Sequence, residues 1–282
     1  MQLNDLYNRC KTGCHAERSE ALIIHNLLSD DEIDKLLDKL IRKVWKAQGM
    51  PDRLSDEVIK YFADELWKAL TEGYGNDLTT VELDTAGEEM LQQLQKNVWH
   101  FSAAKNYTQL KAMSDALIGP DGTLREFNEF KRVATAINAD QNGAWLKAGY
   151  NFAVASGQMA SRWVDAQENK DLFPNLEYSA IMDGHTTVNC IKLDGVVRPV
   201  DDAFWRTWYP PNHWGCRSDV LQNADDTITP MDSITYPEHI PAMFKRNLAA
   251  DGLVFPEGHP YFKDNPEGVE ATANKLMRKY GQ

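Results

Sequence analysis

The sequence lacks any long hydrophobic run. No segment approaches the roughly 20 consecutive apolar residues that a membrane-spanning helix needs. The longest purely apolar stretch near the start, Ala21 to Ile24, is too short for the core of a signal peptide, and no charged head leads into an apolar stretch. We therefore expect a soluble, intracellular protein that does not bind a membrane.

Cysteine is also scarce, with 4 residues in a chain of 282. Cys10, Cys14, Cys190 and Cys216 are too few for the disulfide framework that small secreted domains use. They are either free thiols or metal ligands. Cys10 and Cys14, followed by His15, have the spacing of half a metal site, but no matching half occurs in the helical region, so we interpret them as incidental.

Basic residues are in deficit, since 30 Lys and Arg stand against 42 Asp and Glu and give a formal net charge of −12. A protein that binds bare DNA over its whole surface needs the opposite sign. Small cationic groups occur between Lys39 and Lys46 and between Arg125 and Arg132, but nearby acids dilute both. Any contact with DNA is therefore predicted to be weak or local.

Helical periodicity fills the first 172 residues. Apolar residues recur at three- and four-residue spacing, which is the pattern of amphipathic helices. This pattern covers 33–44, 58–70, 90–98 and 124–137. The clearest helix runs from about Gly143 to Asn169, with many small residues between Ala148 and Ala160. Since small side chains let another helix approach closely, we interpret it as the central helix of a bundle.

The pattern changes at Phe173 and Pro174. Alternation from Leu176 to Met182 predicts a short strand, and two more are predicted over 196–200 and 219–221. The intervening aromatic residues, Phe204 to Trp214, are predicted to form the core of this small region, with Trp205 buried. The residues from about 223 to 260 contain five prolines, which predicts an extended arm that wraps over the folded body.

These patterns predict an α+β protein. A helical bundle occupies 1–172, and a small mixed domain with a short antiparallel sheet occupies 173–222. An extended C-terminal arm with a short terminal helix over 267–280 completes the chain at 223–282.

The stretch from Asp183 to Val220 carries most of the functional information. In order, it contains an Asp after a strand, a Cys, Leu-Asp-Gly, Asp-Asp-x-Phe-Trp, Pro-Pro-Asn, Cys-Arg and a final strand. The residues of this motif are Asp183, Cys190, Leu193, Asp194, Gly195, Asp202, Phe204, Trp205, Pro210, Pro211, Asn212, Cys216 and Arg217. Each piece alone is common, but their order and spacing resemble the head-morphogenesis domain of tailed bacteriophages, the MuF domain.

The resemblance extends over roughly 97–263, with similar segments at 101–105, 150–156 and 255–262. It implies a minor capsid protein of a tailed bacteriophage or prophage, which acts in procapsid assembly near the portal and in DNA packaging or exit. The implied partners are the portal protein and other head components, with DNA only inside the particle. The implied location is the virion or procapsid, assembled in the cytoplasm of the bacterial host.

Two positions depart from the family pattern. The family often has Arg shortly after the first Asp, where this chain has Gly184 and His185. The family motif often ends in Cys-Arg-Cys, where this chain has Ser218 in the last place. A function that needs that Arg or that second Cys is therefore not implied for this chain.

Four residues have the spacing of a metal site, His-x4-Cys-x22-His-x2-Cys, in two close pairs. These are His185, Cys190, His213 and Cys216. Such ligands suit tetrahedral zinc, and a small domain gains stability from a structural metal. The alternative is that both cysteines are buried small apolar side chains and both histidines are surface or aromatic-stacking groups. We therefore predict no obligatory cofactor, and a zinc-stabilised binding module stays open as an alternative.

An enzyme or toxin-like domain is a further alternative, because Asp183, His185 and Cys190 have the residue types of a nucleophilic Cys-His-Asp set. However, the sequence contains no Gly-rich phosphate loop, no nucleophile elbow and no His-Glu-x-x-His. Asp202 before an aromatic block is more simply a helix N-cap, and Arg217 is expected to tie its loop to a carboxylate or a carbonyl. We therefore predict that the protein is not an enzyme.

The portal contact has two candidate segments in the sequence. One is the small-residue helix around Ala148 to Ala160, and the other is the Pro-rich arm, because an extended tail can lie across a neighbour and order on binding.

Overall fold

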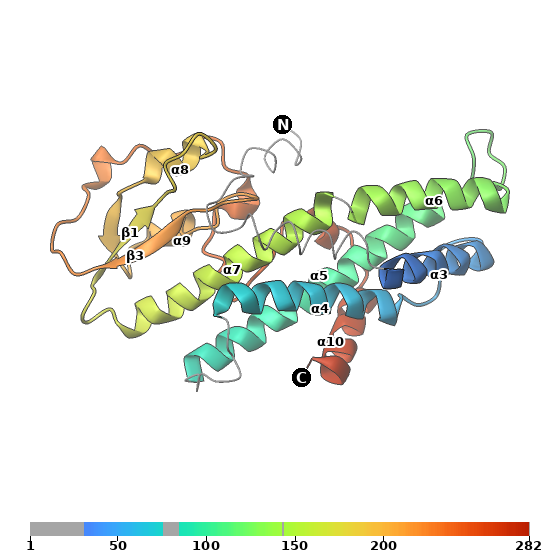
Figure 1. The fold of residues 1–282 in the computed structure, drawn as a ribbon, viewed down its shortest axis with the longest axis horizontal. Helices are drawn as coiled ribbons and strands as arrows, with labels where there is room; N and C mark the ends of the chain where they lie inside the picture. The colour runs from blue at the N-terminus through green and yellow to red at the C-terminus, as the bar shows by residue number, and fades with distance from the viewer. Residues whose placement is uncertain (1–30, 76–84, 143, 282) are drawn as a thin grey trace. The chain divides into compact units, whose positions relative to one another are not determined.

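The computed structural model of this chain describes residues 31–75, 85–142 and 144–281. Cys10, Cys14 and His15 lie outside these ranges. The described chain is helical as far as Glu168 and then continues as short strands, short helices and loops before a last helix (Figure 1). This arrangement confirms the predicted α+β class.

Long helices make up the first part of the chain. They are α3 (Asp31–Ala47), α4 (Asp56–Tyr74), α5 (Thr85–Asp115), α6 (Phe127–Asn142) and α7 (Ala144–Glu168). Each predicted amphipathic segment corresponds to one of these helices, but α5 extends to Asp115, well beyond the predicted 90–98, and α6 begins at Phe127 rather than at 124. In α3, for example, the buried residues recur at three- and four-residue spacing from Ile33 to Val44, and acidic residues in the first turn match the helix dipole. Among the described helices, none combines the length and apolar character that crossing a membrane requires.

The described residues divide into two compact units. One contains Trp67–Leu94 and Tyr150–Gly258, and the other contains residues 31–66, Gln95–Gly149 and 259–281. Helices α4, α5 and α7 each contribute residues to both units, because a long helix packs against different neighbours along its length. The boundaries of the compact units therefore differ from the predicted domain boundaries after 172 and 222. Those domain boundaries stay a prediction.

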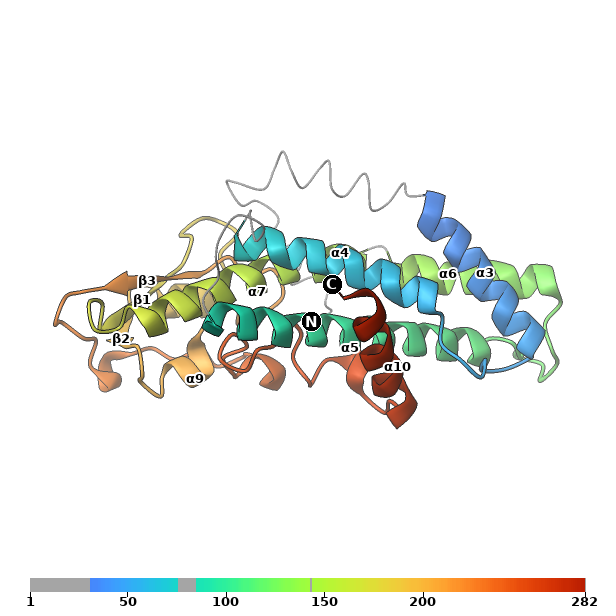
Figure 2. The ribbon, with the colours of Figure 1, turned by 90° about the horizontal axis from the view of Figure 1, so that it is seen from below.

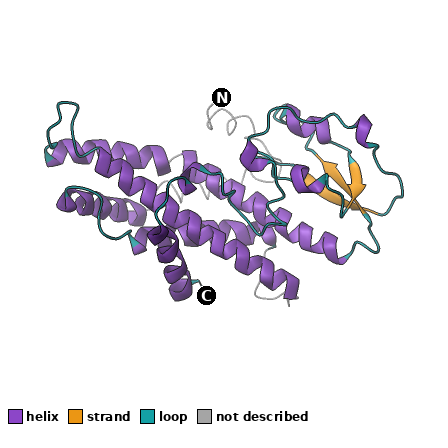
Figure 3. Ribbon diagram, turned by 180° about the vertical axis from the view of Figure 1, so that it is seen from behind, coloured by secondary structure: helices purple, strands orange, loops and turns teal. Residues whose placement is uncertain are grey.

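A small antiparallel sheet lies in the first unit. Its strands are β1 (Asn175–Ser179), β2 (Val197–Pro199) and β3 (Asp219–Asn223), in the order β2-β1-β3 (Figure 3). Strand β1 pairs with both others, so that Tyr178 faces Val220 across the sheet. Leu176 and Tyr178 are both fully buried, since alternate residues of a strand point to the same face. The three predicted strands are confirmed.

Aromatic side chains form the core beside this sheet, as the sequence predicts. Trp205, at the start of α9 (Trp205–Trp208), is only 1% exposed. Its ring centroid lies 4.8 Å from that of Phe204 and 6.1 Å from that of Tyr209. Tyr209 in turn packs edge-on against Trp163 of α7 at 5.1 Å. The hydroxyl of Tyr209 donates to the backbone carbonyl of Met159 at 2.9 Å, which ties α7 to the aromatic core.

The Pro-rich arm is part of this core. Between β3 and the last helix, α10 (Glu267–Tyr280), it forms three short 3₁₀ turns, η1 (Met231–Ser233), η2 (Ala242–Phe244) and η3 (Pro260–Phe262). Phe244 and Phe255 of the arm are fully buried, and both rings lie within about 6 Å of Phe152 on α7. Phe244 and Phe255 of the arm are therefore packed within the chain, whereas Ile228 and Met231 of the arm are exposed.

The small residues of α7 serve close helix packing. A Cβ atom added at Gly157 would lie 2.1 Å from the carbonyl oxygen of Leu70 on α4, and one added at Gly73 would lie 1.9 Å from that of Val154. The backbones of α4 and α7 therefore touch at these glycines. This contact is the close helix approach that the small residues predict, and the central place of α7 in a bundle stays a prediction.

The second unit, which contains residues 31–66, Gln95–Gly149 and 259–281, includes aromatic contacts between helices. Helix α3 packs against α6, with Trp45 of α3 at 5.4 Å from Phe127 and 5.6 Å from Phe130, ring to ring (Figure 2). In the same unit, His259 is buried at the start of η3 and packs edge-on against Phe101 at 4.9 Å. Its Nδ1 accepts a hydrogen bond from the backbone N–H of Tyr261 at 3.1 Å.

Burial lowers the pKa of His259 to about 4, below its usual value of about 6.5. In the unfolded chain the imidazole takes up a proton as the pH falls below about 6.5, whereas in the folded chain it stays neutral down to about 4. Stability is therefore fully present at pH 7 and is lost as the pH falls. Between pH 7 and pH 5 we expect His259 to reduce the free energy of unfolding by about 2 kcal/mol.

Urea unfolding at both pH values, compared with the His259→Asn variant, measures this effect. Asparagine keeps an acceptor for the N–H of Tyr261 but does not titrate, and all other groups contribute equally to both proteins. Equal pH dependence in the two proteins would contradict this prediction, because it would show that folding does not change the pKa of His259.

Candidate functional site: a buried Cys-His-Cys cluster

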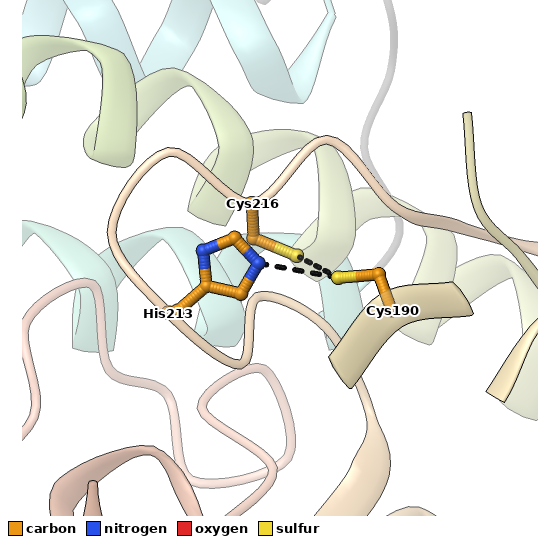
Figure 4. Close-up of side chains that lie close together, drawn as sticks. All are labelled: Cys190, His213 and Cys216. Carbon is orange, nitrogen blue, oxygen red and sulfur yellow. Dashed lines mark hydrogen bonds between the residues drawn. The ribbon is translucent and has the colours of Figure 1, made fainter. Parts of the chain in front are cut away.

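Three side chains with metal-ligating or nucleophilic atoms converge in the first unit: Cys190, His213 and Cys216 (Figure 4). The Sγ of Cys190 lies 3.2 Å from the Nε2 of His213 and 4.0 Å from the Sγ of Cys216. All three ligand atoms lie within 4.8 Å of one another, and all three residues are buried. Two sulfur ligands of one tetrahedral zinc ion lie about 3.8 Å apart, so the observed separation of 4.0 Å between the two sulfurs fits the predicted zinc site.

Helix α8 (Val188–Leu193) positions Cys190. Thr187 is its N-cap, and its hydroxyl oxygen accepts from the backbone N–H of Cys190 at 3.4 Å. The same hydroxyl lies 3.3 Å from the Sγ of Cys190 and 3.1 Å from the Nε2 of His213. A threonine that the motif does not include therefore begins the helix and also touches two residues of the cluster.

A tight turn positions the other two residues. The backbone N–H of Cys216 donates to the carbonyl of His213 at 3.1 Å, and Gly215 between them has a φ of +69°. Glycine is favoured at this φ because it has no Cβ. The turn brings the side chains of His213 and Cys216 to the same side, facing α8 (Figure 4).

The side chains of Asn212 and Tyr178 make polar contacts around this turn and the cluster. The amide of Asn212 donates to the carbonyl oxygens of Tyr209 at 3.1 Å and Thr207 at 3.3 Å. The hydroxyl of Tyr178 lies 3.4 Å from the Oδ1 of Asn212 and 3.7 Å from the Sγ of Cys190. Burial raises the pKa of Tyr178 well above its usual value, so this hydroxyl keeps its proton.

The hydrogen bonds of His213 define its tautomer. Its Nδ1 lies 2.8 Å from the backbone carbonyl oxygen of Trp214, and a carbonyl can only accept. Nδ1 therefore carries the proton in the neutral imidazole, and Nε2 presents its lone pair toward Cys190. A backbone carbonyl on one ring nitrogen is the usual way in which proteins orient a ligating histidine.

The electrostatics of the cluster favour a thiolate at Cys190. The hydrogen bond from Cys216 holds the pKa of Cys190 well below its usual value, and the interaction with His213 acts in the same direction, against the opposing effect of burial. The hydrogen bond that it donates to Cys190, together with burial, raises the pKa of Cys216. Burial is the largest single effect on His213 and lowers its pKa, but the hydrogen bond and charge interaction with Cys190 and the bond to the carbonyl of Trp214 together raise the pKa above its usual value. A thiolate is the form of cysteine that binds metals and acts as a nucleophile.

A small pocket opens onto this cluster. It is lined by Ile181, His185, Thr186, Thr187, Cys190, His213, Arg217 and Ser218. The fourth residue of the predicted metal set, His185, lines the pocket but is exposed and lies outside the converging group. Ser218, in contrast, is buried and also lines the pocket. The structure thus brings together three of the four predicted ligands.

Residues 124–221, which include the whole cluster, match the family described as Phage Mu protein F like protein. This segment is Mu F-like. The resemblance found in the sequence motif is therefore confirmed, and we call residues 124–221 the Mu F-like segment.

Two relatives share this part of the chain. One is "Putative capsid assembly protein F" of Escherichia phage Mu, 39% identical over 92 residues, which cover 30% of this chain and 21% of the relative. The other is "Mu-like prophage FluMu F protein" of Haemophilus influenzae, 41% identical over 61 residues, which cover 22% of this chain and 15% of the relative. The matches therefore span about a fifth or less of either relative. No solved structure gives a significant match.

Arg217 of the Mu F-like segment is tied to a carboxylate, as the sequence predicts. Its guanidinium donates to both oxygens of Asp183, at 2.9 and 2.6 Å. These two bonds, and then the backbone N–H of His185, hold the pKa of Asp183 well below its usual range. Asp183 is thus engaged by Arg217, and the histidine that contacts Cys190 is His213, not His185. The alternative catalytic set of Asp183, His185 and Cys190 is therefore not assembled in the described residues.

The remaining motif residues of the Mu F-like segment serve the fold. One oxygen of Asp202 accepts from the backbone N–H of Phe204 at 2.7 Å and the other from Arg198 at 2.5 Å. The predicted N-cap role of Asp202 is wrong, because the N-cap of α9 is Phe204 and makes no side-chain capping bond; Asp202 instead stabilises the turn before the helix. Asp194 accepts from the backbone N–H of Ala180 at 2.8 Å, and Gly195 has a φ of +73° at the end of α8. The buried apolar members are Leu193, Phe204 and Trp205.

Tyr178, Thr187 and Ser218 touch the cluster but were not among the predicted site residues. The sequence contains one indication that Tyr178 is buried, because strand alternation places it on the same face as Leu176. Thr187 had another, since threonine is a common N-cap before a helical segment. Ser218 was noted only as a departure from the family motif.

Proposed function

We propose that this protein is a minor capsid protein of a tailed bacteriophage or prophage, which acts in procapsid assembly by binding the portal protein. The observation that carries the proposal is the Mu F-like segment, with its 39% identity to a phage Mu protein named as a putative capsid assembly protein. In this proposal the protein belongs to the procapsid or virion, takes part in DNA packaging or exit through the portal, and is not an enzyme.

An exposed apolar surface in the Mu F-like segment supports binding to another protein. Four large apolar residues of the stretch from β1 into α8 are exposed, and Met182 at 60% and Val188 at 66% are the most open. The other two are Ile181 and Ile191. Val188 and Ile191 lie on one face of α8, because residues three apart are helix neighbours. We call these four residues the α8 surface, and exposed apolar groups of this kind mark interaction sites.

The two segments that the sequence offered for the portal contact are less suited to it. The backbone of α7 at Gly157 packs against α4, and Phe244 and Phe255 of the arm are buried in its own unit. The α8 surface is therefore the better candidate for the portal contact.

The charge distribution favours a protein partner over free DNA. The net charge is −12, and several cationic residues of the two candidate groups have partners within the chain. Arg42 pairs with Asp38 at 2.8 Å, and Lys131 pairs with the same carboxylate at 2.5 Å. Lys43 donates to the carbonyl of Arg53 at 2.7 Å. These contacts weaken the attraction of a polyanion at these positions, and in this proposal DNA is contacted only inside the particle.

Co-expression with the portal protein of the same phage or prophage, followed by size-exclusion chromatography, tests this function. We expect the two proteins to co-elute at micromolar concentration, and we expect the double variant Met182→Asp/Val188→Asp to lose co-elution. The matched control is Ile228→Asp/Met231→Asp, which changes two exposed apolar residues of the arm to the same residue. This control is expected to co-elute with the portal protein.

Failure to co-elute together with retention of DNA would favour a nucleic-acid-binding function. If the parent protein failed to co-elute and retained DNA at about 200 mM salt, the portal proposal would be wrong, because weak non-specific DNA binding is lost at that salt concentration. Loss of co-elution in both double variants would show that the α8 surface is not the specific contact.

A further inference from the structure

We propose that Cys190, His213 and Cys216 bind a zinc ion, which connects helix α8 to the turn before β3 and leaves its fourth coordination position facing the pocket. This site goes beyond the proposed role in head assembly and does not depend on it.

The distances within the cluster fit a tetrahedral ion. With usual zinc–sulfur and zinc–nitrogen bond lengths, two sulfur ligands lie about 3.8 Å apart, and a sulfur and a nitrogen lie about 3.6 Å apart. The observed separations are 4.0 Å between the two sulfurs and 3.2 Å between the Sγ of Cys190 and the Nε2 of His213. Small rotations of the side chains are therefore enough to admit the ion.

The donor atoms select the metal by their chemistry. Two sulfurs and one imidazole nitrogen suit zinc, whereas calcium and magnesium require oxygen ligands. His213 already presents the lone pair of Nε2 to the cluster, because the carbonyl of Trp214 holds the proton on Nδ1 at 2.8 Å. The imidazole is thus oriented before any metal arrives.

The cluster does not have the surroundings of an apolar core cysteine. Besides His213 and Cys216, two hydroxyl groups point at the Sγ of Cys190, that of Thr187 at 3.3 Å and that of Tyr178 at 3.7 Å. A cysteine that only fills space packs against aliphatic groups and needs no polar partners. Polar groups that converge on one buried sulfur stabilise a thiolate, which is the ligating form.

The fourth coordination position faces the pocket, because Cys190 and His213 both line it. In this proposal a water molecule takes that position, since the exposed His185 lies outside the converging group. Ser218, which directly precedes β3, is buried and lines the same pocket as Cys190 and His213. A thiol at position 218 would therefore supply a third sulfur to the site.

Metal analysis of the full chain, purified from zinc-supplemented cells, tests the proposal. The Cys10→Ser/Cys14→Ser background removes the two other cysteines of the sequence. We expect one zinc per chain in this background, and we expect loss of the zinc on further change of Cys190→Ser, His213→Gln or Cys216→Ser. His185→Gln is the matched control, a histidine of the same pocket, and it is expected to keep the zinc.

Cobalt replacement provides a test that needs no ligand variant. Cobalt bound to the apo protein in the Cys10→Ser/Cys14→Ser background is expected to show thiolate-to-metal charge transfer and the intense visible bands of tetrahedral coordination. Ser218→Cys is expected to slow the transfer of zinc to a chelator roughly tenfold or more, because it closes the open position.

Several results would overturn the proposal. A background protein without zinc and without a cobalt spectrum would show that the cluster does not bind metal. Zinc that persisted in Cys190→Ser/Cys216→Ser would place the metal elsewhere. Loss of zinc in His185→Gln would contradict the open position. A disulfide between Cys190 and Cys216 in freshly purified protein, found by alkylation and mass spectrometry, would replace the metal site with a covalent link.

Discussion

Replacement of Trp205 by alanine is expected to lower the free energy of unfolding by about 3–5 kcal/mol, which is the usual cost of removing a large aromatic side chain from a core. Trp205 is 1% exposed and contacts the rings of Phe204 and Tyr209. Its indole N–H also donates to the carbonyl of Arg198 on β2 at 3.3 Å. The substitution therefore leaves a cavity between α9 and the sheet, and it removes the hydrogen bond to the carbonyl of Arg198 on β2.

Urea unfolding followed by far-ultraviolet circular dichroism measures this loss without relying on tryptophan fluorescence. Trp208→Ala is the matched control, because Trp208 lies on the same short helix but is only partly buried, against Tyr236 at 5.6 Å. We expect its cost to be less than half that of Trp205→Ala. Equal costs for the two variants would contradict the central position of Trp205 in the core.

The second large effect is expected at Gly157, where alanine should lower the free energy of unfolding by about 2–3 kcal/mol. The added Cβ would lie 2.1 Å from the carbonyl oxygen of Leu70 and 3.0 Å from the backbone nitrogen of Tyr74. Both neighbours are backbone atoms of α4, so no side chain can rotate to make room. The two helices must separate, which weakens the contacts around them.

Gly149→Ala on the same helix is the control for this variant. There the added Cβ meets only the Cδ2 of Leu66, at 3.9 Å, so the change is sterically neutral. Because alanine is the better helix former, we expect Gly149→Ala to raise the free energy of unfolding by about 0.5–1 kcal/mol. A stabilising effect of Gly157→Ala would show that the close approach of α4 and α7 is absent.

The local structure of this chain follows largely from its sequence. Apolar periodicity predicts the long helices, and alternation predicts β1, because these patterns reflect contacts of each segment with a neighbouring surface. The short strands β2 and β3 and the terminal helix α10 are also predicted from the sequence. The aromatic block around Trp205 and the pairing of Arg217 with a carboxylate are predicted for similar reasons. The motif from Asp183 to Arg217 also indicates the family, since order and spacing along the chain are properties of the sequence itself.

The composition of the Cys190 cluster was decided by tertiary structure. Spacing in the sequence offered His185 and His213 equally, but only His213 reaches Cys190, because the turn at Gly215 directs it inward while Asp183 and Arg217 hold the loop near His185 at the surface. Tyr178 and Ser218 come to the cluster from β1 and from the start of β3. Periodicity describes one segment at a time, so it cannot show which side chains from separate segments meet; the path of the folded chain decides that.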